Sequence, residues 1–293
     1  MTGAAGRLAK AVLPRLCADP AIGQVTGIDR VRPAFDHAKF QSVVADTGER
    51  AAHLSLHGAD ALVNLAFVVL RGRLPPHAML RNNVDGTKAL LSAAHDAGIG
   101  SIVHLSSAAV YGHGTDVAED APLAPLRRFG YALHKAEVDA WIAQALPGVA
   151  VLRPAIILGP NAQPLLRQLA AAPCYVRLPE PQPRLQCVHE DDVAQAVALA
   201  LAQRASGAFN LAAPTDFSLR ELVLARHPHA PGVPLSLARV ALGFAWRATG
   251  WGGEPGWLDG IAQSLTLDCR RALSVLGWRP RHEQWREIAG IIE

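Results

Sequence analysis

The sequence predicts an α/β fold built on a doubly wound parallel sheet, with a smaller C-terminal domain. Short apolar stretches alternate with helical stretches, and right-handed crossovers between them place the strands in one parallel sheet. Residues 60–66 are almost continuously apolar, as expected for a parallel strand covered on both faces. The chain also opens with a Gly-x-x-Gly turn, formed by Gly3 and Gly6, that leads directly into a helical stretch.

The strands and helices can be placed along the chain. Strands are predicted over residues 24–29, 40–46, 60–66, 101–107, 148–153 and 207–212. Helices are predicted from the glycine turn to near Cys17, over residues 77–97, and over the apolar residues 235–251, which we expect to pack in the cap or in a dimer. We assign residues 1–157 and 186–213 to a dinucleotide-binding domain, and residues 158–185 and 214–293 to a substrate-binding cap.

The start of the chain is unusual for this type of sheet. Met1 stands where the last hydrophobic residue of a first, central strand belongs, so that strand is missing from the sequence. A sheet without its central strand would lose backbone hydrogen bonds and leave a gap. We therefore expect the native protein to begin about six to ten residues, one short strand, before Met1.

The composition is that of an ordinary globular enzyme, since half of the 293 residues are hydrophobic and 18% are charged. The net charge of +3 is spread without a basic run, so no nucleic-acid partner is expected. No apolar run reaches the roughly 18 residues of a membrane span, and no membrane partner is expected. The four cysteines lie far apart and no metal-ligand spacing occurs, which indicates free thiols, a cytoplasmic location and no metal.

The glycine turn and the strand that follows it predict a dinucleotide site. Gly3 allows a tight turn, and Gly6 lets the backbone approach a pyrophosphate at the positive end of a helix. Asp29 ends the next strand, where a carboxylate can accept hydrogen bonds from the adenosine ribose. This pattern favours NAD. Arg30 leaves NADP open, because its guanidinium could bind a 2′-phosphate if Asp29 turned away.

Tyr131 and Lys135 form the candidate reactive pair. They are one helical turn apart, so their side chains lie on the same face of a helix. A nearby ammonium favours the phenolate, and we expect Lys135 to lower the pKa of Tyr131 until the phenol can exchange a proton near neutrality.

Several motifs together resemble a known family. The Tyr-x-x-x-Lys pair follows a strand that ends in Ser106 and Ser107, and residues 83–87 read Asn-Val-Asp-Gly-Thr. Residues 187–194 read Cys-Val-His-Glu-Asp-Asp-Val-Ala. With the glycine turn, this pattern resembles the extended short-chain dehydrogenase/reductase family, and within it the NAD-dependent epimerase/dehydratase branch and its UDP-glucose 4-epimerase-like members. The resemblance implies a Rossmann-type fold.

The resemblance also assigns roles to residues. Ser107 would orient the reacting oxygen, Tyr131 would move the proton, and Lys135 would hold the nicotinamide ribose. Asn83 would fix the sheet and active site by hydrogen bonds. The remaining implied contacts are Asp46 at the adenine, Leu65 and Ala66 beside the cofactor, and Arg177 and Arg184 at the pyrophosphate of a substrate.

Three functions remain open at this stage. The first is a homodimeric sugar epimerase that oxidises and re-reduces a nucleotide sugar on one retained NAD. The second is a net dehydrogenase or reductase of an apolar, 3β-hydroxysteroid-like alcohol or ketone, whose pocket residues 67–70, Phe244, Trp246, Trp251 and Trp257 could wall. The third is a non-catalytic dinucleotide-binding regulator, against which Ser107, Tyr131 and Lys135 argue. Dehydration is disfavoured, because Ala108 and Ala109 replace the acidic pair of the family's dehydratases.

Overall fold

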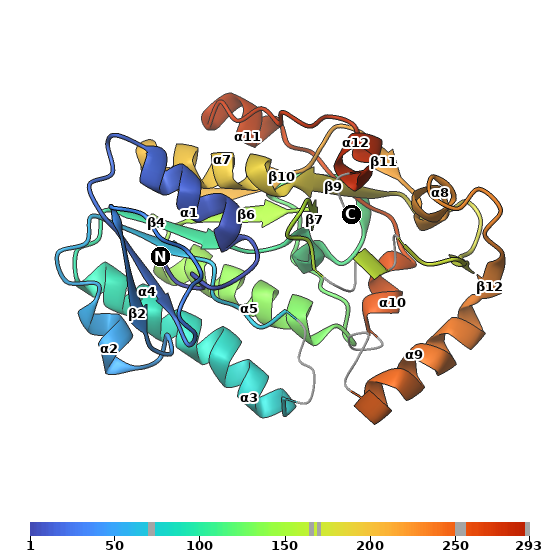
Figure 1. Cartoon of the computed structure of the whole chain (residues 1–293), viewed down its shortest axis with the longest axis horizontal. Coiled ribbons are helices and arrows are strands. Elements are labelled where there is room, and N and C mark those ends of the chain that lie inside the picture. The colour runs from blue at the N-terminus through green and yellow to red at the C-terminus, as the bar shows by residue number, and fades with distance from the viewer. Residues whose placement is uncertain (70–73, 164–166, 169–170, 250–255, 291–293) are drawn as a thin grey trace.

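The structure is a computed structural model that describes residues 1–69, 74–163, 167–168, 171–249 and 256–290. It confirms the α/β fold with a main parallel sheet (Figure 1). The strands pair in the order β2–β1 and β3–β4–β6–β10. Their bounds are β1 Val25–Asp29, β2 Phe40–Val44, β3 Ala61–Asn64, β4 Ser101–Leu105, β6 Ala150–Pro154 and β10 Gly207–Leu211. Each of the six overlaps a strand that the sequence predicts.

The N-terminus joins the two parts of the main sheet. Thr2 forms parallel bridges to Ile28 of β1 and to Asn64 of β3. The amide of Thr2 donates to the Val63 carbonyl at 2.9 Å, and the amide of Ile28 donates to the Met1 carbonyl at 2.8 Å. Met1 and Thr2 therefore occupy the position between β1 and β3 that the sequence assigns to the end of a central strand.

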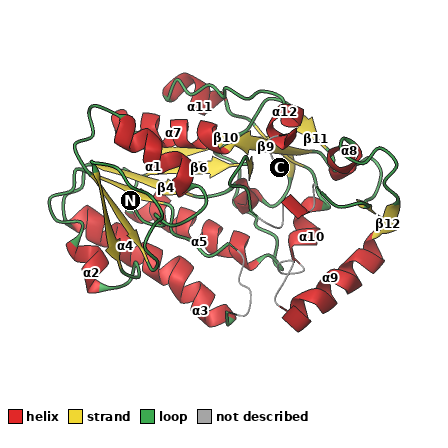
Figure 2. Ribbon diagram, viewed as in Figure 1, coloured by secondary structure: helices red, strands yellow, loops and turns green. Residues whose placement is uncertain are grey.

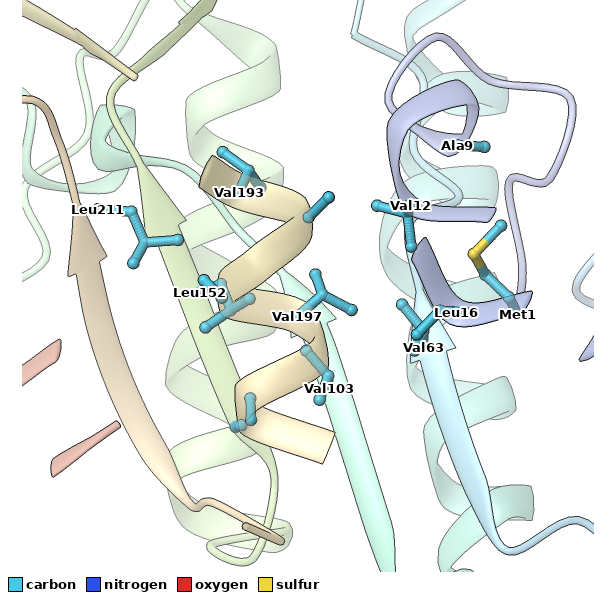
Figure 3. Packing of buried hydrophobic residues seen from close by; sticks show 14 of the residues in the cluster. Met1, Ala9, Val12, Leu16, Val63, Val103, Leu152, Val193, Val197 and Leu211 are labelled. Carbon is cyan, nitrogen blue, oxygen red and sulfur yellow. The ribbon is translucent and has the colours of Figure 1, made fainter. Parts of the chain in front are cut away.

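Helices cover both faces of the main sheet (Figure 1). On one face lie α1 (Ala9–Ala18), α7 (Glu190–Ala202) and α11 (Arg270–Val275). On the other lie α4 (Gly86–Asp96) and α5 (Gly130–Ala145), with the short α2 (Arg50–Leu54) against α4. Figure 3 shows the hydrophobic core between the first of these faces and its helices. Side chains of α1 and α7 meet those of the strands there, among them Val12, Leu16, Val103, Leu152 and Val193.

The helix predicted over residues 77–97 is interrupted. It consists of α3 (Pro76–Leu80), a π-helical turn η1 (Arg81–Asp85) and α4. The buried Asn83 lies in this turn, where its side chain accepts from the Val68 amide at 2.7 Å and donates to the Val68 carbonyl at 3.0 Å. The wider π turn thus accompanies a side chain that anchors the loop after β3, which confirms a structural role for Asn83.

A second group of strands lies beyond the carboxyl ends of the main sheet (Figure 2). Four strands pair in the order β11–β9–β13–β5, β7 pairs with β9, and β12 pairs with β8. Their bounds are β5 Gly114–Val117, β7 Ile156–Leu158, β8 Tyr175–Arg177, β9 Leu185–His189, β11 Asp216–Phe217, β12 Gly232–Pro234 and β13 Leu265–Leu267. The helices beside them are α8 Leu219–Leu224, α9 Leu235–Thr249, α10 Gly256–Ile261 and α12 Trp285–Gly290. The domain boundaries given above remain our proposal.

The apolar helix α9 is only partly covered. Leu237, Val240 and Phe244 expose 58%, 69% and 75% of their surface, so Phe244 does not wall a pocket. Leu70 and Trp251, and the side chain of Trp257, lie outside the described residues. Within the described part of the chain, no helix has the length and apolarity to cross a membrane.

Candidate active site

A cavity of about 300 Å³ lies where the glycine turn meets the carboxyl ends of the main-sheet strands. Gly3, Gly6 and Leu65 line one part of it, and Ser107 and Tyr131 line another. Ligands of open α/β sheets bind at this edge. The predicted cofactor turn, Ser107 and Tyr131 therefore share one cavity, whereas Lys135 is not among the described residues that line it.

Ser107 and Tyr131 are positioned by two different elements. Ser107 follows β4 and caps the short 3₁₀ helix η2 (Ala108–Tyr111), with its hydroxyl accepting from the Ala109 amide at 3.2 Å. Tyr131 lies in the first turn of α5, and the Ser107 hydroxyl lies near enough to its phenol to act on the phenol's pKa. Ser107 thus combines a capping role with a contact to the predicted proton carrier.

The pKa of Tyr131 differs from the sequence-based expectation. Burial raises it to about 12, and the Ser107 hydroxyl only partly opposes this. Burial also lowers the pKa of Lys135 to about 7. The expectation of a lowered phenol pKa was wrong for this state, because helical spacing reports proximity and not the loss of solvent. Tyr131 is accordingly a protonated phenol, a proton donor, near neutral pH.

Lys135 lies on α5 one turn after Tyr131, as predicted, and is buried. Its ammonium donates a hydrogen bond to the Leu105 carbonyl at the end of β4. It also lies 3.6 Å from the centroid of the Phe67 ring, which packs edge-on against Tyr131 at 5.6 Å between centroids. Phe67 therefore contacts both members of the reactive pair, a contact that the sequence analysis did not foresee.

The glycine turn is shaped to receive a dinucleotide. Gly3 has a φ of +69°, and the amide of Gly6 donates to its carbonyl at 2.9 Å. A Cβ on Gly3 would lie 2.8 Å from the Ala66 nitrogen, and one on Gly6 would lie 2.9 Å from the Gly3 oxygen. Gly3 lets the turn pack against Leu65 and Ala66, and Gly6 lets the turn close on the Gly3 carbonyl, because both positions lack side chains. These residues fit a pyrophosphate-binding turn at the start of α1.

Asp29 ties the glycine turn to the end of β1. Its carboxylate accepts from the Ala5 amide at 3.0 Å and from the Val31 amide at 3.2 Å. Arg30 approaches Asp46 at 4.0 Å between Nε and Oδ2. The three residues predicted for the adenosine end thus lie together at the ends of β1 and β2.

The two arginines predicted for the substrate lie elsewhere. Arg184 pairs with Asp216 at 2.6 Å and with Glu221 at 2.8 Å, and these carboxylates raise the pKa of its guanidinium. Arg177 is exposed on β8. Neither belongs to the described residues that line the cavity. The charged side chains in the described lining of the cavity are instead those of Arg7 and Glu190. The Arg7 guanidinium donates to the Ala162 carbonyl at 3.3 Å.

A buried polar network beneath the site was not predicted. Arg153 of β6 donates from Nε to Asp139 at 2.9 Å and from Nη1 to the Tyr111 hydroxyl at 2.8 Å. The Tyr111 hydroxyl donates to Asn210 of β10 at 2.8 Å. One signal was available in the sequence: Asp139 follows Lys135 by the same helical turn that separates Lys135 from Tyr131.

The sequence of residues 1–212 matches the NAD-dependent epimerase/dehydratase family. The chain belongs to this family. As the family's description states, its members depend on NAD, and NAD is the cofactor we assign to the glycine turn.

The chain is also similar to individual proteins. An uncharacterised protein of Mycobacterium tuberculosis is 29% identical over 98% of the chain, which spans only 31% of that relative's length. A UDP-glucose 4-epimerase of Azospirillum brasilense is 27% identical over 78% of the chain and 70% of its own. A 4-hydroxy-2-methyl-3-oxo-4-farnesyl-3,4-dihydroquinoline-1-oxide ketoreductase of Stigmatella aurantiaca is 38% identical over 39% of the chain and 36% of its own.

Among solved structures, MoeE5 in complex with UDP-glucose and NAD has the same fold. Its TM-score is 0.77 at 22% identity, with 99% of this chain and 95% of that chain covered.

Cofactor choice in this family member gives a first prediction. We expect NAD to bind at least about fivefold more tightly than NADP. A 2′-phosphate beside Asp29 would suffer a like-charge repulsion on the order of 1 to 3 kcal/mol at an effective dielectric constant near 20. Asp29→Asn should reduce the preference for NAD over NADP, because it removes the negative charge but keeps an oxygen acceptor. Titration of both dinucleotides checks this, with Asp36→Asn as the control in the exposed loop after β1. Equal affinity of the wild-type protein for both would contradict the role of Asp29.

Proposed function

We propose that the chain catalyses NAD-dependent hydride transfer at a secondary alcohol or ketone carbon. The observation that carries this proposal is the presence of Ser107 and Tyr131 in the lining of the cavity that the glycine turn also lines. A proton carrier and an oxygen-binding hydroxyl beside a dinucleotide cradle are the groups that this reaction requires.

The residues of the chain would act as follows. Bound NAD supplies a hydride acceptor, and its reduced form a hydride donor. Ser107 holds the substrate oxygen, and Tyr131 exchanges the proton of the hydroxyl that is oxidised or formed. Lys135 holds the nicotinamide ribose, and to do so its ammonium exchanges the Phe67 contact for the ribose hydroxyls. The protonated phenol of Tyr131 suits the reductive direction, in which it donates its proton to a carbonyl oxygen.

The finer proposal is epimerisation of a nucleotide sugar. In this reaction the substrate carbon would be oxidised and then reduced on its opposite face without release of the cofactor, with Ser107 holding the oxygen and Tyr131 exchanging its proton. The family and the UDP-glucose 4-epimerase relative support it. Arg184 would have to leave Asp216 or Glu221 to bind a substrate pyrophosphate, so substrate entry would rearrange this cluster.

A second candidate is the net reduction of an apolar ketone. Its support is the wall of the cavity around Tyr131, which is built from apolar side chains: Phe67, Leu126, Phe129, Ile156, Leu185 and Leu265. Apolar pockets of this kind receive ligands with few polar groups. The ketoreductase relative acts on a farnesylated ring compound according to its name, and so supports the same substrate class.

Two measurements test the proposal and separate the candidates. The purified protein is mixed with NAD and candidate alcohols, or with NADH and candidate ketones, and absorbance at 340 nm is followed. A net oxidoreductase changes the absorbance. An epimerase leaves it constant while it converts one sugar nucleotide into another, which chromatography detects. The absence of both changes across sugar nucleotides and apolar ketones would contradict hydride transfer.

Binding of UDP gives the matching prediction. If the substrate is a nucleotide sugar, UDP should bind in the millimolar range or tighter, and the double variant Arg177→Ala/Arg184→Ala should weaken it by a few kcal/mol, the scale of lost charged hydrogen bonds. Calorimetric titration measures this, with Arg220→Ala on α8 as the control. No UDP binding to the intact protein would favour the apolar ketone.

A further inference from the structure

The reactive face of α5 carries a third ionisable side chain. Tyr131, Lys135 and Asp139 follow one another at intervals of four residues, so they lie along one side of the helix. Lys135 and Asp139 are each only 2% exposed. A buried carboxylate is costly unless charges and hydrogen bonds compensate for it, and its presence next to the reactive pair therefore calls for a reason.

Asp139 is held by a rigid partner. Arg153 binds it at 2.9 Å, and both side chains of this pair are nearly or fully buried. The Arg153 guanidinium is fixed in turn by the Tyr111 hydroxyl at 2.8 Å and the Glu119 carbonyl at 3.1 Å. Burial raises the pKa of Asp139, and the Arg153 guanidinium is the largest of the influences that oppose this rise. The carboxylate therefore has a fixed place under the active site.

The ionisable groups around Lys135 lie on three elements, α5, β4 and β6. On its own helix lie Tyr131 and Asp139, and on β4 lies His104, whose pKa is held well below its usual value by burial and by Lys135 itself. Arg153 on β6 faces Asp139. Burial lowers the pKa of Lys135, and Asp139 is the group that opposes this. Among these neighbours, Asp139 is the only carboxyl group.

We propose that Asp139 is a positioning residue that keeps Lys135 in its ammonium form for cofactor binding, and that Arg153 keeps Asp139 ionised for this purpose. The proposal rests on the proposed function only through the contact of Lys135 with the nicotinamide ribose. An ammonium carries a positive charge and offers three hydrogen-bond donors to the ribose hydroxyls. The neutral amine has no charge and offers only two donors. Affinity for NAD should therefore be high below the pKa of Lys135 and should fall as pH rises through it.

The test is the pH dependence of NAD affinity, measured by titration from pH 5 to pH 9. Asp139→Asn removes the negative charge, which disfavours the protonated lysine and lowers its pKa. The midpoint of the affinity loss should move to lower pH by on the order of one pH unit. Glu137→Gln is the matched control, because it removes an exposed carboxylate from the same helix, where it pairs with Lys88.

A second variant guards against misfolding, since Asp139→Asn leaves Arg153 buried without its counter-charge. Asp139→Leu/Arg153→Met replaces the ion pair with apolar side chains, an exchange that buried pairs often tolerate. It should show a midpoint shift in the same direction. A purely structural role for Asp139 would instead weaken NAD equally at every pH and leave the midpoint unchanged, which would overturn the proposal.

A pH-independent affinity of the wild-type protein would also overturn it. Because the readout is cofactor binding, it does not depend on finding the substrate. A shifted midpoint in a protein without any redox activity would support the role of Asp139 while contradicting the proposed reaction, so the two failures can be told apart.

Discussion

Tyr131→Phe is expected to lower turnover roughly a hundredfold or more, the scale of losing a general acid or base. The change removes one oxygen and leaves the ring that packs against Phe67 and Phe129. The fold and the affinity for NAD should therefore stay as in the wild-type protein. Turnover is measured with the alcohol, ketone or sugar nucleotide that the absorbance and chromatography assays identify, and melting temperature and NAD titration are measured in parallel.

Tyr175→Phe is the control for this prediction. It removes the same oxygen from β8, outside the residues that line the cavity, where the ring lies beside the guanidinium of Arg220. Its turnover should match that of the wild-type protein. If Tyr131→Phe kept full turnover, Tyr131 could not be the proton carrier, and Ser107 and Lys135 would lose their assigned roles with it.

The strands and the reactive pair could be predicted because their signals are local. The inner strands of the main sheet, such as β4 and β6, are short apolar runs, because burial on both faces requires such a run. Tyr131 and Lys135 share a face because of helical spacing alone. The glycine turn likewise depends on two residues without side chains, Gly3 and Gly6.

The surroundings of the reactive pair could not be predicted, because they depend on contacts between distant segments. Phe67 lies after β3, yet it reaches both Tyr131 and Lys135 on α5. Its contact with the ammonium and the burial of the phenol set the local charge state. A sequence pattern gives neither, and this is why the expected direction of the Tyr131 pKa was wrong.

The position of Arg184 illustrates the same limit. Strand β11 pairs antiparallel with β9, and this pairing brings Asp216 beside Arg184 from 32 residues away. Glu221, the N3 residue of the capping box of α8, is the second ion-pair partner of Arg184. The sequence offered a cationic side chain near the substrate segment, whereas the tertiary structure supplies the two carboxylates that now hold it.

Gly3→Ala is expected to weaken NAD binding roughly tenfold or more, since 1.4 kcal/mol corresponds to a factor of ten. The φ of +69° costs a residue with a Cβ about 1 to 2 kcal/mol. The added carbon would also lie 2.8 Å from the Ala66 nitrogen and 2.9 Å from the Leu65 carbonyl carbon. These are backbone atoms, and the amide of Leu65 is bonded to the Thr2 carbonyl at 3.3 Å, so they cannot turn aside as a side chain would.

The turn itself must therefore move, and with it the amides that would face the pyrophosphate. Melting temperature should fall by roughly 4 °C or more at the same time. Gly23→Ala is the matched control, because a Cβ at Gly23 meets no atom within 4 Å and its φ is not positive. It should leave NAD affinity unchanged and at most raise stability slightly, by restricting the unfolded chain. If Gly3→Ala bound NAD as tightly as Gly23→Ala, the glycine turn could not be the cofactor cradle, and the dinucleotide would have to lie elsewhere along the cavity.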